Sequence, residues 1–483
     1  MLTEAFPKLN DSRAVIALRA FLRSGWFIGV VVLLMACSEL FSLELYVIYA
    51  YAVLGLVIVL LSEDTLPVVP MVVCGYMLFS AKNNPGMHPD ALFSQPYAQV
   101  ALIFAIAVIA VLLVGRLISK LMEGKKRGAP KLLAGFALLG AAYLLGGLFS
   151  PYYAGDSVFF GFVQIAALSG FYFYFYFTVD WDKVPEHHLA LLFTIVGVGV
   201  FAEVVGMYFN EGAPGLDGTG DRNKLYTGWG VWNCVGCVMA MCMPAPVYFA
   251  VKKKHGWMFT LLSCVFYLGV ILTQSRGSIL FASVVFLACI VYTLVASKGR
   301  EKIWSAVVYA ALLLGAGCAF LIYPDKLADL FRSLVNVGMD DSGRLDLYDQ
   351  CWKTFLNFPV FGVGWYDAPG IQLANGMMLN NGDPRLEGYF IPGFAHNTFF
   401  QLIAMGGVFA FLAYLIHRAQ TVIMVVRDPS PVRIVAMLCV CSMLLTSLVD
   451  NHVFNMGPGL LYSVLLVFAE KTGGSGRRLP SKS

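Results

Sequence analysis

Long apolar runs separated by short polar connections fill most of this chain. From Trp26 onwards, runs of about 20 apolar residues recur, which is the helix length needed to cross a hydrocarbon layer roughly 30 Å thick. The polar and apolar alternation of membrane β-strands is absent. The pattern predicts an all-α, polytopic transmembrane helical bundle of about 14 spans. We expect the spans to begin near Trp26, Leu45, Leu66, Gln99, Lys131, Ser157, His188, Thr227, Trp257, Ser278, Ile303, Thr398, Val432 and Phe454.

Charge divides the connections into two alternating sets. Most of the lysines and arginines fall in one set and in the two ends of the chain, and the positive-inside rule places basic connections in the cytoplasm. We therefore expect both termini to be cytoplasmic. The basic set comprises Lys8, Arg13, Arg19, Arg23, Arg116, Lys120, Lys125, Lys126, Arg127, Lys252, Lys253, Lys254, Lys298, Arg300, Lys302, Arg418, Arg427, Arg433, Lys471, Arg477 and Arg478.

This topology divides the chain into segments. Residues 1–25 are predicted to form a cytoplasmic N-terminal segment, 26–323 a transmembrane bundle and 324–397 a long outward loop. Residues 398–470 then form C-terminal transmembrane helices, and 471–483 a cytoplasmic tail. Because the N-terminal segment is polar and basic before any apolar run, we do not expect it to be a cleavable signal peptide.

The composition agrees with a membrane protein. Hydrophobic residues make up 59% of the 483 residues and charged ones 13%, which is more apolar surface than one water-soluble core can hide. The net charge of +4 says little about partners, and we expect no nucleic-acid partner. All 11 cysteines except Cys351 lie in apolar runs, so no disulfide framework is predicted. Cys234 and Cys237 have zinc-like spacing without a histidine or a second cysteine pair in register, and we predict no metal site.

The strongest candidate for chemistry is a His-Asn pair. His396 and Asn397 stand at the mouth of a predicted span, directly after the longest polar segment of the chain. An imidazole exchanges protons near neutral pH, and at a boundary between water and lipid it does so without burial in hydrocarbon. The alternative is that His396 caps the loop and hydrogen-bonds the start of the helix. Position alone favours neither.

A second candidate is Arg276, in a very tight outward turn between two spans, where ordinary topology avoids a cation. A planar guanidinium offers a phosphate or diphosphate two parallel hydrogen bonds and stays charged. Gly277 and the neighbouring serines would let backbone N–H groups approach the same anion as the next helix begins. The alternative is an arginine that pairs with lipid headgroups.

The long outward loop contains a predicted amphipathic helix on the membrane face. Ser342 is its expected N-cap, and Arg344 would lie in its first turn. Its apolar positions follow a helical spacing: Leu345, Tyr348, Trp352 and Phe355. The glycine-punctuated turn Pro359–Trp365 would then fold the loop back over the bundle. Other outward cations have weaker claims, and each is more simply a solvated surface charge: Arg222, Lys224, Arg332 and Arg385.

Carboxylates give weaker signals. Glu39 and Glu203 fall near the outer ends of spans, so either they border one outward cavity or each snorkels to the interface. Asp180 and Asp182 have the D-x-D spacing of metal-dependent, nucleotide-sugar enzymes, but the topology puts them on the cytoplasmic side and we interpret them as a loop.

Taken together, the motifs resemble the O-antigen ligase and polymerase superfamily. The resemblance runs roughly from Thr273 to Leu415, over the S-R-G turn at Arg276, the G-R-x(n)-W helix at Arg344 that leads to F-G-V-G, and the His-Asn at His396 that opens a span and precedes Gly-Gly. It implies a metal-independent, inverting transfer of a glycan from undecaprenyl diphosphate to an acceptor hydroxyl, without a cofactor. It also implies a GT-C-like fold, with the site on the periplasmic face of the bacterial inner membrane.

The resemblance implies roles for individual residues. Arg276 and Arg344 would bind the diphosphate, and His396 would act at the acceptor. The chemistry agrees, because displacing a diphosphate from an anomeric carbon needs cations on the departing oxygens and a base or acceptor for the incoming hydroxyl. His452, in an outward turn beside Asp450, is a second candidate base or an orienting partner. The expected substrate-binding set is completed by Arg332, Arg222, Asn397 and His452.

Related activities share such a site: ligation of O-antigen to lipid A core, polymerisation of repeat units, and glycan transfer to a protein such as pilin. Of these activities, we predict ligation of O-antigen to lipid A core, with polymerisation as the alternative. The predicted number of spans exceeds that usual for ligases and gives weight to polymerisation, and the lack of a large outward domain after the last span lowers the protein-glycosylation alternative. Expected partners are the lipid-linked glycan donor, lipid A core or a growing glycan, and membrane lipids.

The alternative from a different class is a polysaccharide transporter or flippase, for which we find neither internal repeats nor ionisable groups near mid-membrane.

Overall fold

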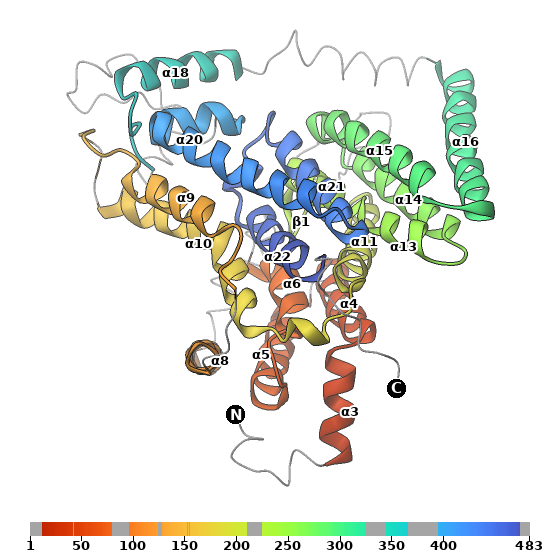
Figure 1. Ribbon diagram of the computed structural model, residues 1–483, viewed down its shortest axis with the longest axis horizontal. Coiled ribbons are helices and arrows are strands. Elements are labelled where there is room, and N and C mark those ends of the chain that lie inside the picture. Colours follow the sequence, from red (N-terminus) through yellow and green to blue (C-terminus); the bar gives the residue numbers. More distant parts are fainter. Residues whose placement is uncertain are drawn as a thin grey trace.

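The computed structural model describes residues 12–41, 43–79, 96–123, 128–151, 153, 155–209, 225–324, 344–365 and 395–473. Most of these residues are helical (Figure 1). The described strands, β1 (Tyr226–Thr227) and β2 (Gly230–Val231), pair antiparallel. The helices are α3 (Arg13–Leu22), α4 (Gly25–Phe41), α5 (Glu44–Leu61), α6 (Val68–Phe79), α8 (Pro96–Met122), α9 (Leu133–Leu145), α10 (Gly155–Thr178), η2 (Trp181–Lys183), α11 (His188–Met207), α12 (Trp232–Cys242), α13 (Ala245–Lys252), α14 (Trp257–Leu272), α15 (Arg276–Ala296), α16 (Gly299–Ile322), α18 (Arg344–Asn357), α20 (Thr398–Arg427), α21 (Pro431–Thr446), η5 (His452–Phe454) and α22 (Met456–Thr472).

Seven helices in the described part of the chain are long and apolar enough to cross a membrane. The count rises to eight if α3 and α4, which meet at 66°, form one bent span. Further apolar helices are shorter, α9 and α21 among them. The prediction of an all-α, polytopic membrane protein is confirmed at this level, and the number of spans and their orientation stay predictions.

Close packing of small residues holds neighbouring helices together. The helix α10 packs along α22, and α9 packs along α20. A bilayer offers little hydrophobic drive for helices to associate, so van der Waals contact at small residues matters more than in water. At Gly161 of α10, a Cβ would lie 2.2 Å from the carbonyl oxygen of Tyr143 in α9. Gly197 of α11 likewise leaves room for the ring of Phe266 in α14.

A break in α20 receives the segment that follows α18. The break lies at Gly407, where φ is 62° and ψ is −163°. The fold-back segment, Pro359–Trp365, enters it: Val363 N donates to the Ala404 carbonyl at 2.9 Å, and Val408 N donates to the first carbonyl of the segment at 2.8 Å. A Cβ at Gly407 would lie 2.4 Å from the backbone of this segment, so only glycine fits. The backbone groups freed by the break are thus satisfied within the protein, as a membrane interior requires.

The helix α18 lies against the outer part of α20 (Figure 1). Its Tyr348 ring stacks on Phe400 with centroids 4.6 Å apart, and Cys351 is buried beside it. Leu345 and Trp352 are instead exposed. A helix is therefore present from Arg344 to Asn357, where an amphipathic helix was predicted, but the expected single apolar stripe is divided between α20 and the surface. The expected N-cap, residue 342, lies outside the described residues.

One part of the charge pattern is corrected. Arg418 was predicted in a cytoplasmic connection, and the structure places it inside α20, well before the end of that helix at Arg427. Its guanidinium carbon lies 4.4 and 4.6 Å from the ring centroids of Tyr414 and Tyr462, and aromatic faces stabilise such a cation away from water. The neighbouring His417 is fully buried.

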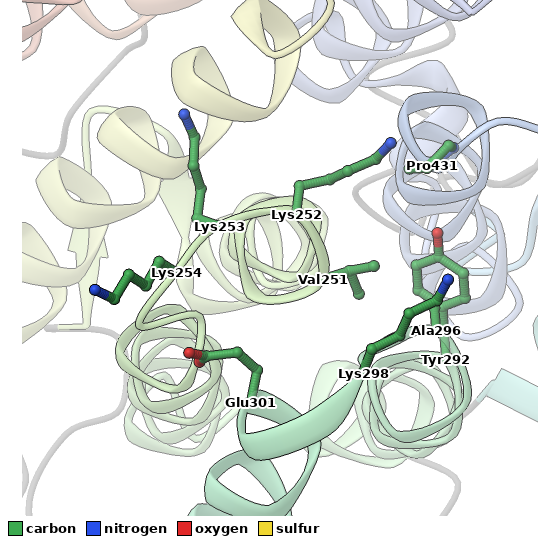
Figure 2. Close-up of a pocket in the computed structure, with 9 residues that line it drawn as sticks. All are labelled: Val251, Lys252, Lys253, Lys254, Tyr292, Ala296, Lys298, Glu301 and Pro431. Atoms are coloured by element: carbon green, nitrogen blue, oxygen red, sulfur yellow. The ribbon is translucent and has the colours of Figure 1, made fainter.

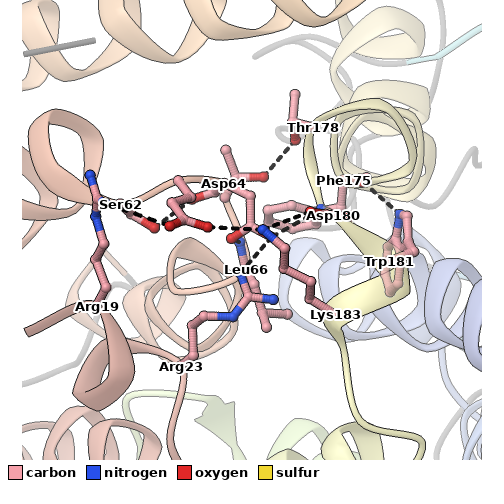
Figure 3. A network of polar contacts seen from close by, with 12 residues as sticks. Arg19, Arg23, Ser62, Asp64, Leu66, Phe175, Thr178, Asp180, Trp181 and Lys183 are labelled. Atoms are coloured by element: carbon pink, nitrogen blue, oxygen red, sulfur yellow. Dashed lines mark hydrogen bonds and ion pairs between the residues drawn. The ribbon is translucent and has the colours of Figure 1, made fainter. Parts of the chain in front are cut away.

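A polar network ties α3, α5, α8 and α10 together around Asp64 (Figure 3). The Asp64 carboxylate is buried, pairs with Arg23 at 3.0 Å and accepts from the backbone N–H of Asp180 at 2.9 Å. Its backbone carbonyl accepts from Arg116 at 3.1 Å. The Asp180 carboxylate pairs with Lys183 at 3.2 Å. The D-x-D sequence thus takes part in a structural connection, and the described residues contain no group of three or more His, Cys, Asp or Glu arranged for a metal ion.

We expect Asp64→Ala to lower the free energy of unfolding by about 3 kcal/mol, because it leaves the Arg23 cation and buried backbone N–H groups without their acceptor. The thermal midpoint and chemical unfolding of the detergent-solubilised protein measure this loss.

The matched control is Glu63→Ala. This neighbouring carboxylate also forms ion pairs, at 3.5 Å with Arg19 and 3.0 Å with Lys183, but 48% of its side chain is exposed. Such pairs contribute less than about 1 kcal/mol. Equal losses in the two variants would show that the buried network adds nothing beyond a surface ion pair.

Candidate functional site

The turn at residues 447–451, between α21 and η5, contacts all three sequence motifs. Arg344 Nη1 donates to the Val449 carbonyl at 3.0 Å. His396 Nδ1 lies 3.3 Å from Asp450 Oδ1. A Cβ on Gly277, in the turn next to Arg276, would lie 2.2 Å from Val449 Cγ2. The structure therefore brings the S-R-G turn, the first residue of α18 and the His-Asn pair onto one short stretch of chain.

The backbone carbonyls of the turn explain why these segments meet here. The end of α21 finds its partners locally, because Ser447 N, Leu448 N and Val449 N donate to carbonyls of its last turn. The carbonyls of the following turn are satisfied from outside: Ser447 O by Thr398 N at 3.0 Å, Leu448 O by Asn397 Nδ2 at 2.8 Å and Val449 O by Arg344 Nη1 at 3.0 Å. The start of α20 and Arg344 of α18 thus supply the donors for the turn that follows α21.

Arg276 is the first residue of α15. Ser275 caps this helix by accepting from Ser278 N, and its hydroxyl donates to Asn233 Oδ1 of α12 at 2.8 Å. Gln274, just before the cap, has a φ of 53°, in the left-handed region that non-glycine residues rarely adopt. The Arg276 side chain is half-buried, and no hydrogen bond or ion pair holds its guanidinium to the described residues. The turn is fixed, and its cation is left without a counter-ion from the described protein.

The capping role weighed for His396 belongs to its neighbour. Asn397 Oδ1 accepts from Phe399 N at 2.8 Å and from Phe400 N at 3.3 Å, so Asn397 caps α20. His396 has a φ of 50°, and its carbonyl accepts from the Tyr348 hydroxyl at 3.3 Å. Its ring remains 40% exposed beside Asp450. The imidazole therefore faces both a carboxylate and the surface.

Asp450 is held ionised by its surroundings. Burial works to raise the pKa of this carboxyl, but the hydrogen bond with His396 and the charges of His452 and His396 lower it well below its usual range. An ionised carboxylate only accepts hydrogen bonds, so the facing Nδ1 of His396 carries the proton in this contact. With Nδ1 donating to Asp450, Nε2 is the ring nitrogen that can accept a proton from another group.

His452, the second candidate base, lies beneath the turn and is 1% exposed. Burial lowers its pKa, against the opposing effect of the Asp450 carboxylate. A buried ring in this position contributes to the environment of Asp450 and does not reach the surface. Arg222 and Arg332 lie outside the described residues.

The sequence did not identify the residues that support the site. Gln401 Oε1 accepts from Ala395 N and from Asn451 Nδ2, both at 2.6 Å, and so joins the residues before α20 to the 447–451 turn. Two features of the sequence could have pointed to these residues: the glutamine in the first turns of a predicted span, and the polar triplet from Asp450 to His452. The sequence did not show that the triplet lies beside Gln401 and His396, because about 50 residues separate them.

The remaining candidates have structural contacts. Glu39 accepts from Gly228 N at 3.1 Å, in the hairpin of β1 and β2. Glu203 is buried, so it does not snorkel, and it borders a cavity of about 10 Å³ beside Trp229, which has room for no more than a water molecule. Cys234 Sγ accepts from the amide of Asn455 at 3.2 Å.

Comparison with known proteins adds one finding to this geometry. Residues 259–415 match the model of the family described as O-antigen ligase. No curated protein matches the chain. The matched range contains Arg276, Arg344 and His396, and it overlaps the stretch in which the motifs were recognised. This match agrees with the resemblance of the motifs to the O-antigen ligase and polymerase superfamily, and it supports a glycan-transferring ligase or polymerase role at the level of the family.

Proposed function

We propose that this protein transfers a glycan from undecaprenyl diphosphate to an acceptor hydroxyl at the periplasmic face of the bacterial inner membrane. The acceptor that we favour is lipid A core, which makes the reaction O-antigen ligation. The observation that carries the proposal is the convergence of Arg276, Arg344 and His396 on the 447–451 turn. Cations for a leaving diphosphate and an imidazole for an incoming hydroxyl then lie around one stretch of chain.

The diphosphate end of the donor binds at Arg276 and Arg344. The unpaired guanidinium of Arg276 supports this role, because a half-buried cation without a counter-ion is costly until an anion joins it. Its planar fork matches two phosphate oxygens. Arg344 uses one donor on the Val449 carbonyl, which fixes the side chain at the same turn.

His396 acts on the acceptor. The hydroxyl proton passes to Nε2 while the acceptor oxygen attacks the anomeric carbon, and Asp450 stabilises the imidazolium that forms. The bond between the anomeric carbon and the diphosphate oxygen breaks, and undecaprenyl diphosphate leaves with the electron pair on its oxygen, held by the arginines. Attack opposite the leaving group inverts the anomeric carbon. Neither a sugar nucleotide nor a metal ion has a role in this proposal.

The direct test is reconstitution of the purified protein in liposomes with an undecaprenyl-diphosphate-linked glycan. One arm supplies lipid A core and a second arm supplies only more donor. We expect glycan on lipid A core, detected by mass spectrometry, with equal yield in the presence of EDTA.

Product in the donor-only arm alone would establish the polymerase alternative. Movement of the donor across the bilayer without a new covalent product would establish the transporter alternative. Loss of activity in EDTA that magnesium restores would overturn the metal-independent mechanism.

We expect Arg276→Ala to reduce the rate of transfer by about 10²- to 10³-fold, the usual cost of removing one group that stabilises developing negative charge. Arg276→Lys should recover only part of the rate, because an ammonium lacks the two-pronged geometry. Arg300→Ala, in the first turn of α16, is the control and should transfer normally. Wild-type rates in Arg276→Ala, at an unchanged thermal midpoint, would remove this residue from the mechanism.

His396→Ala and Asp450→Asn should each slow transfer by about 10²- to 10⁴-fold. The asparagine keeps an acceptor for Asn451 N, which Asp450 Oδ1 now binds at 2.8 Å, but it no longer fixes the tautomer of His396. Because the two residues act as a unit, the double variant should be no slower than His396→Ala alone.

The control for this pair is Asp349→Asn, an exposed carboxylate on α18 that pairs with Lys353 at 2.5 Å. Full activity is expected there. If the loss of rate in the double variant equals the product of the two single losses, Asp450 and His396 act independently. Normal activity in Asp450→Asn would show that Asp450 does not orient His396.

A further inference from the structure

A cavity of about 620 Å³ lies between the end of α13, the connection from α15 to α16 and the start of α21 (Figure 2). Its lining includes Lys252, Lys253, Lys254 and Lys298. The S-R-G turn joins the end of α14 to the start of α15, whereas this cavity lies at the start of α14 and the end of α15. Since α15 spans 21 residues, the two places are separated by about 30 Å of helix. The cavity is therefore distinct from the candidate transfer site.

Positive charge in the cavity is poorly compensated. None of the four ammonium groups has an ion pair with the described residues. Glu301, which also lines the cavity, directs its Oε1 to the backbone N–H of His255 at 3.0 Å. The lining of the cavity thus carries an excess of cations, with four lysines and one carboxylate.

The side chains show where an anion would sit. In Figure 2, Lys252 and Lys298 both reach towards the start of α21 at Pro431, with Tyr292 on the same side, whereas Lys253 and Lys254 point outward from the rim. The start of a helix carries partial positive charge and favours an anion. Two ammonium groups and a helix start around one space suit a phosphate group.

The surroundings favour a phosphate that belongs to a lipid. Val295, in the last turn of α15, is 77% exposed, and Ile303 and Trp304, in the first turns of α16, are 63% and 53% exposed. Apolar side chains exposed on α15 and α16, close in sequence to the lining residues Ala296 and Glu301, suit acyl chains, and tryptophan is typical of the boundary between lipid and water. Lysines in a pocket between membrane helices on the cytoplasmic side are a known way to hold an anionic headgroup.

We infer that this cavity binds the phosphate of an anionic phospholipid at the cytoplasmic boundary of the bilayer, with Lys252 and Lys298 as its principal ligands. The bound lipid links α13, α16 and α21 and stabilises the folded protein by mass action. This inference is independent of the transfer reaction, because none of its residues belongs to the candidate transfer site.

The test uses the full-length protein in detergent, titrated with phosphatidylglycerol or phosphatidylcholine and followed by native mass spectrometry and thermal midpoint. Each lysine near a membrane surface contributes about 1 kcal/mol, or roughly fivefold in affinity. We therefore expect the double variant Lys252→Gln/Lys298→Gln to weaken the tightest phosphatidylglycerol binding by about 25-fold and to lose the associated rise in thermal midpoint. Phosphatidylcholine should give no tight site in either protein.

The control is Arg300→Gln/Lys302→Gln, which removes the same charge from the adjacent first turn of α16 but from residues outside the cavity lining. It should bind phosphatidylglycerol as the parent does. Equal losses in both double variants would overturn the site in favour of general surface attraction.

A separate arm with inorganic phosphate or pyrophosphate distinguishes the sources. Soluble anion that raises the thermal midpoint through Lys252 and Lys298, without any phosphatidylglycerol binding, would overturn the lipid assignment and establish a soluble-phosphate site.

Discussion

The backbone carbonyls of the 447–451 turn are the constraint on which the candidate site depends. These carbonyls follow the last residue of α21, and a backbone group withdrawn from water is costly to leave without a partner. Here the donors come from the start of α20 and from Arg344 of α18, on three successive carbonyls of the turn. Completing the hydrogen bonds of this turn therefore assembles the site, and the same contacts set the positions of Arg344 and His396.

This arrangement also accounts for the unusual backbone at His396. A φ of 50° costs a non-glycine residue of order 1 kcal/mol, and such strain persists only where the surroundings enforce it. Asn397 is fixed from both ends of its side chain, by the cap of α20 and by the Leu448 carbonyl, and the carbonyl of His396 is held by Tyr348. The left-handed turn is the way in which the chain meets these contacts while its imidazole faces Asp450.

The sequence predicted what local patterns determine. Apolar runs located the helices, the S-R-G turn was expected just before a span that begins near Ser278, and the glycines of the fold-back segment marked a turn. It did not predict Asp450 as the partner of His396, because a contact between residues 54 positions apart depends on how α20 and α21 pack. The same reason explains Arg418: charge counting cannot tell a basic residue after a helix from one inside it when aromatic rings of another helix supply the contacts.

Arg276 is the residue whose position is least favourable without a ligand. A cation at the first position of a helix faces the positive end of the helix dipole, which costs roughly 0.3–1 kcal/mol. Partial burial removes part of its hydration, and the described residues offer it no counter-ion. Ser275, Asn233 and Gly277 nevertheless hold the turn tightly against α12 and the 447–451 turn. A diphosphate bound here would reverse all of these terms at once, because it neutralises the guanidinium, accepts from the first N–H groups of α15 and restores the hydrogen bonds lost on burial. The packing of this turn therefore holds Arg276 where the cation is unfavourable without a ligand. The same features that make it unfavourable favour the binding of an anion.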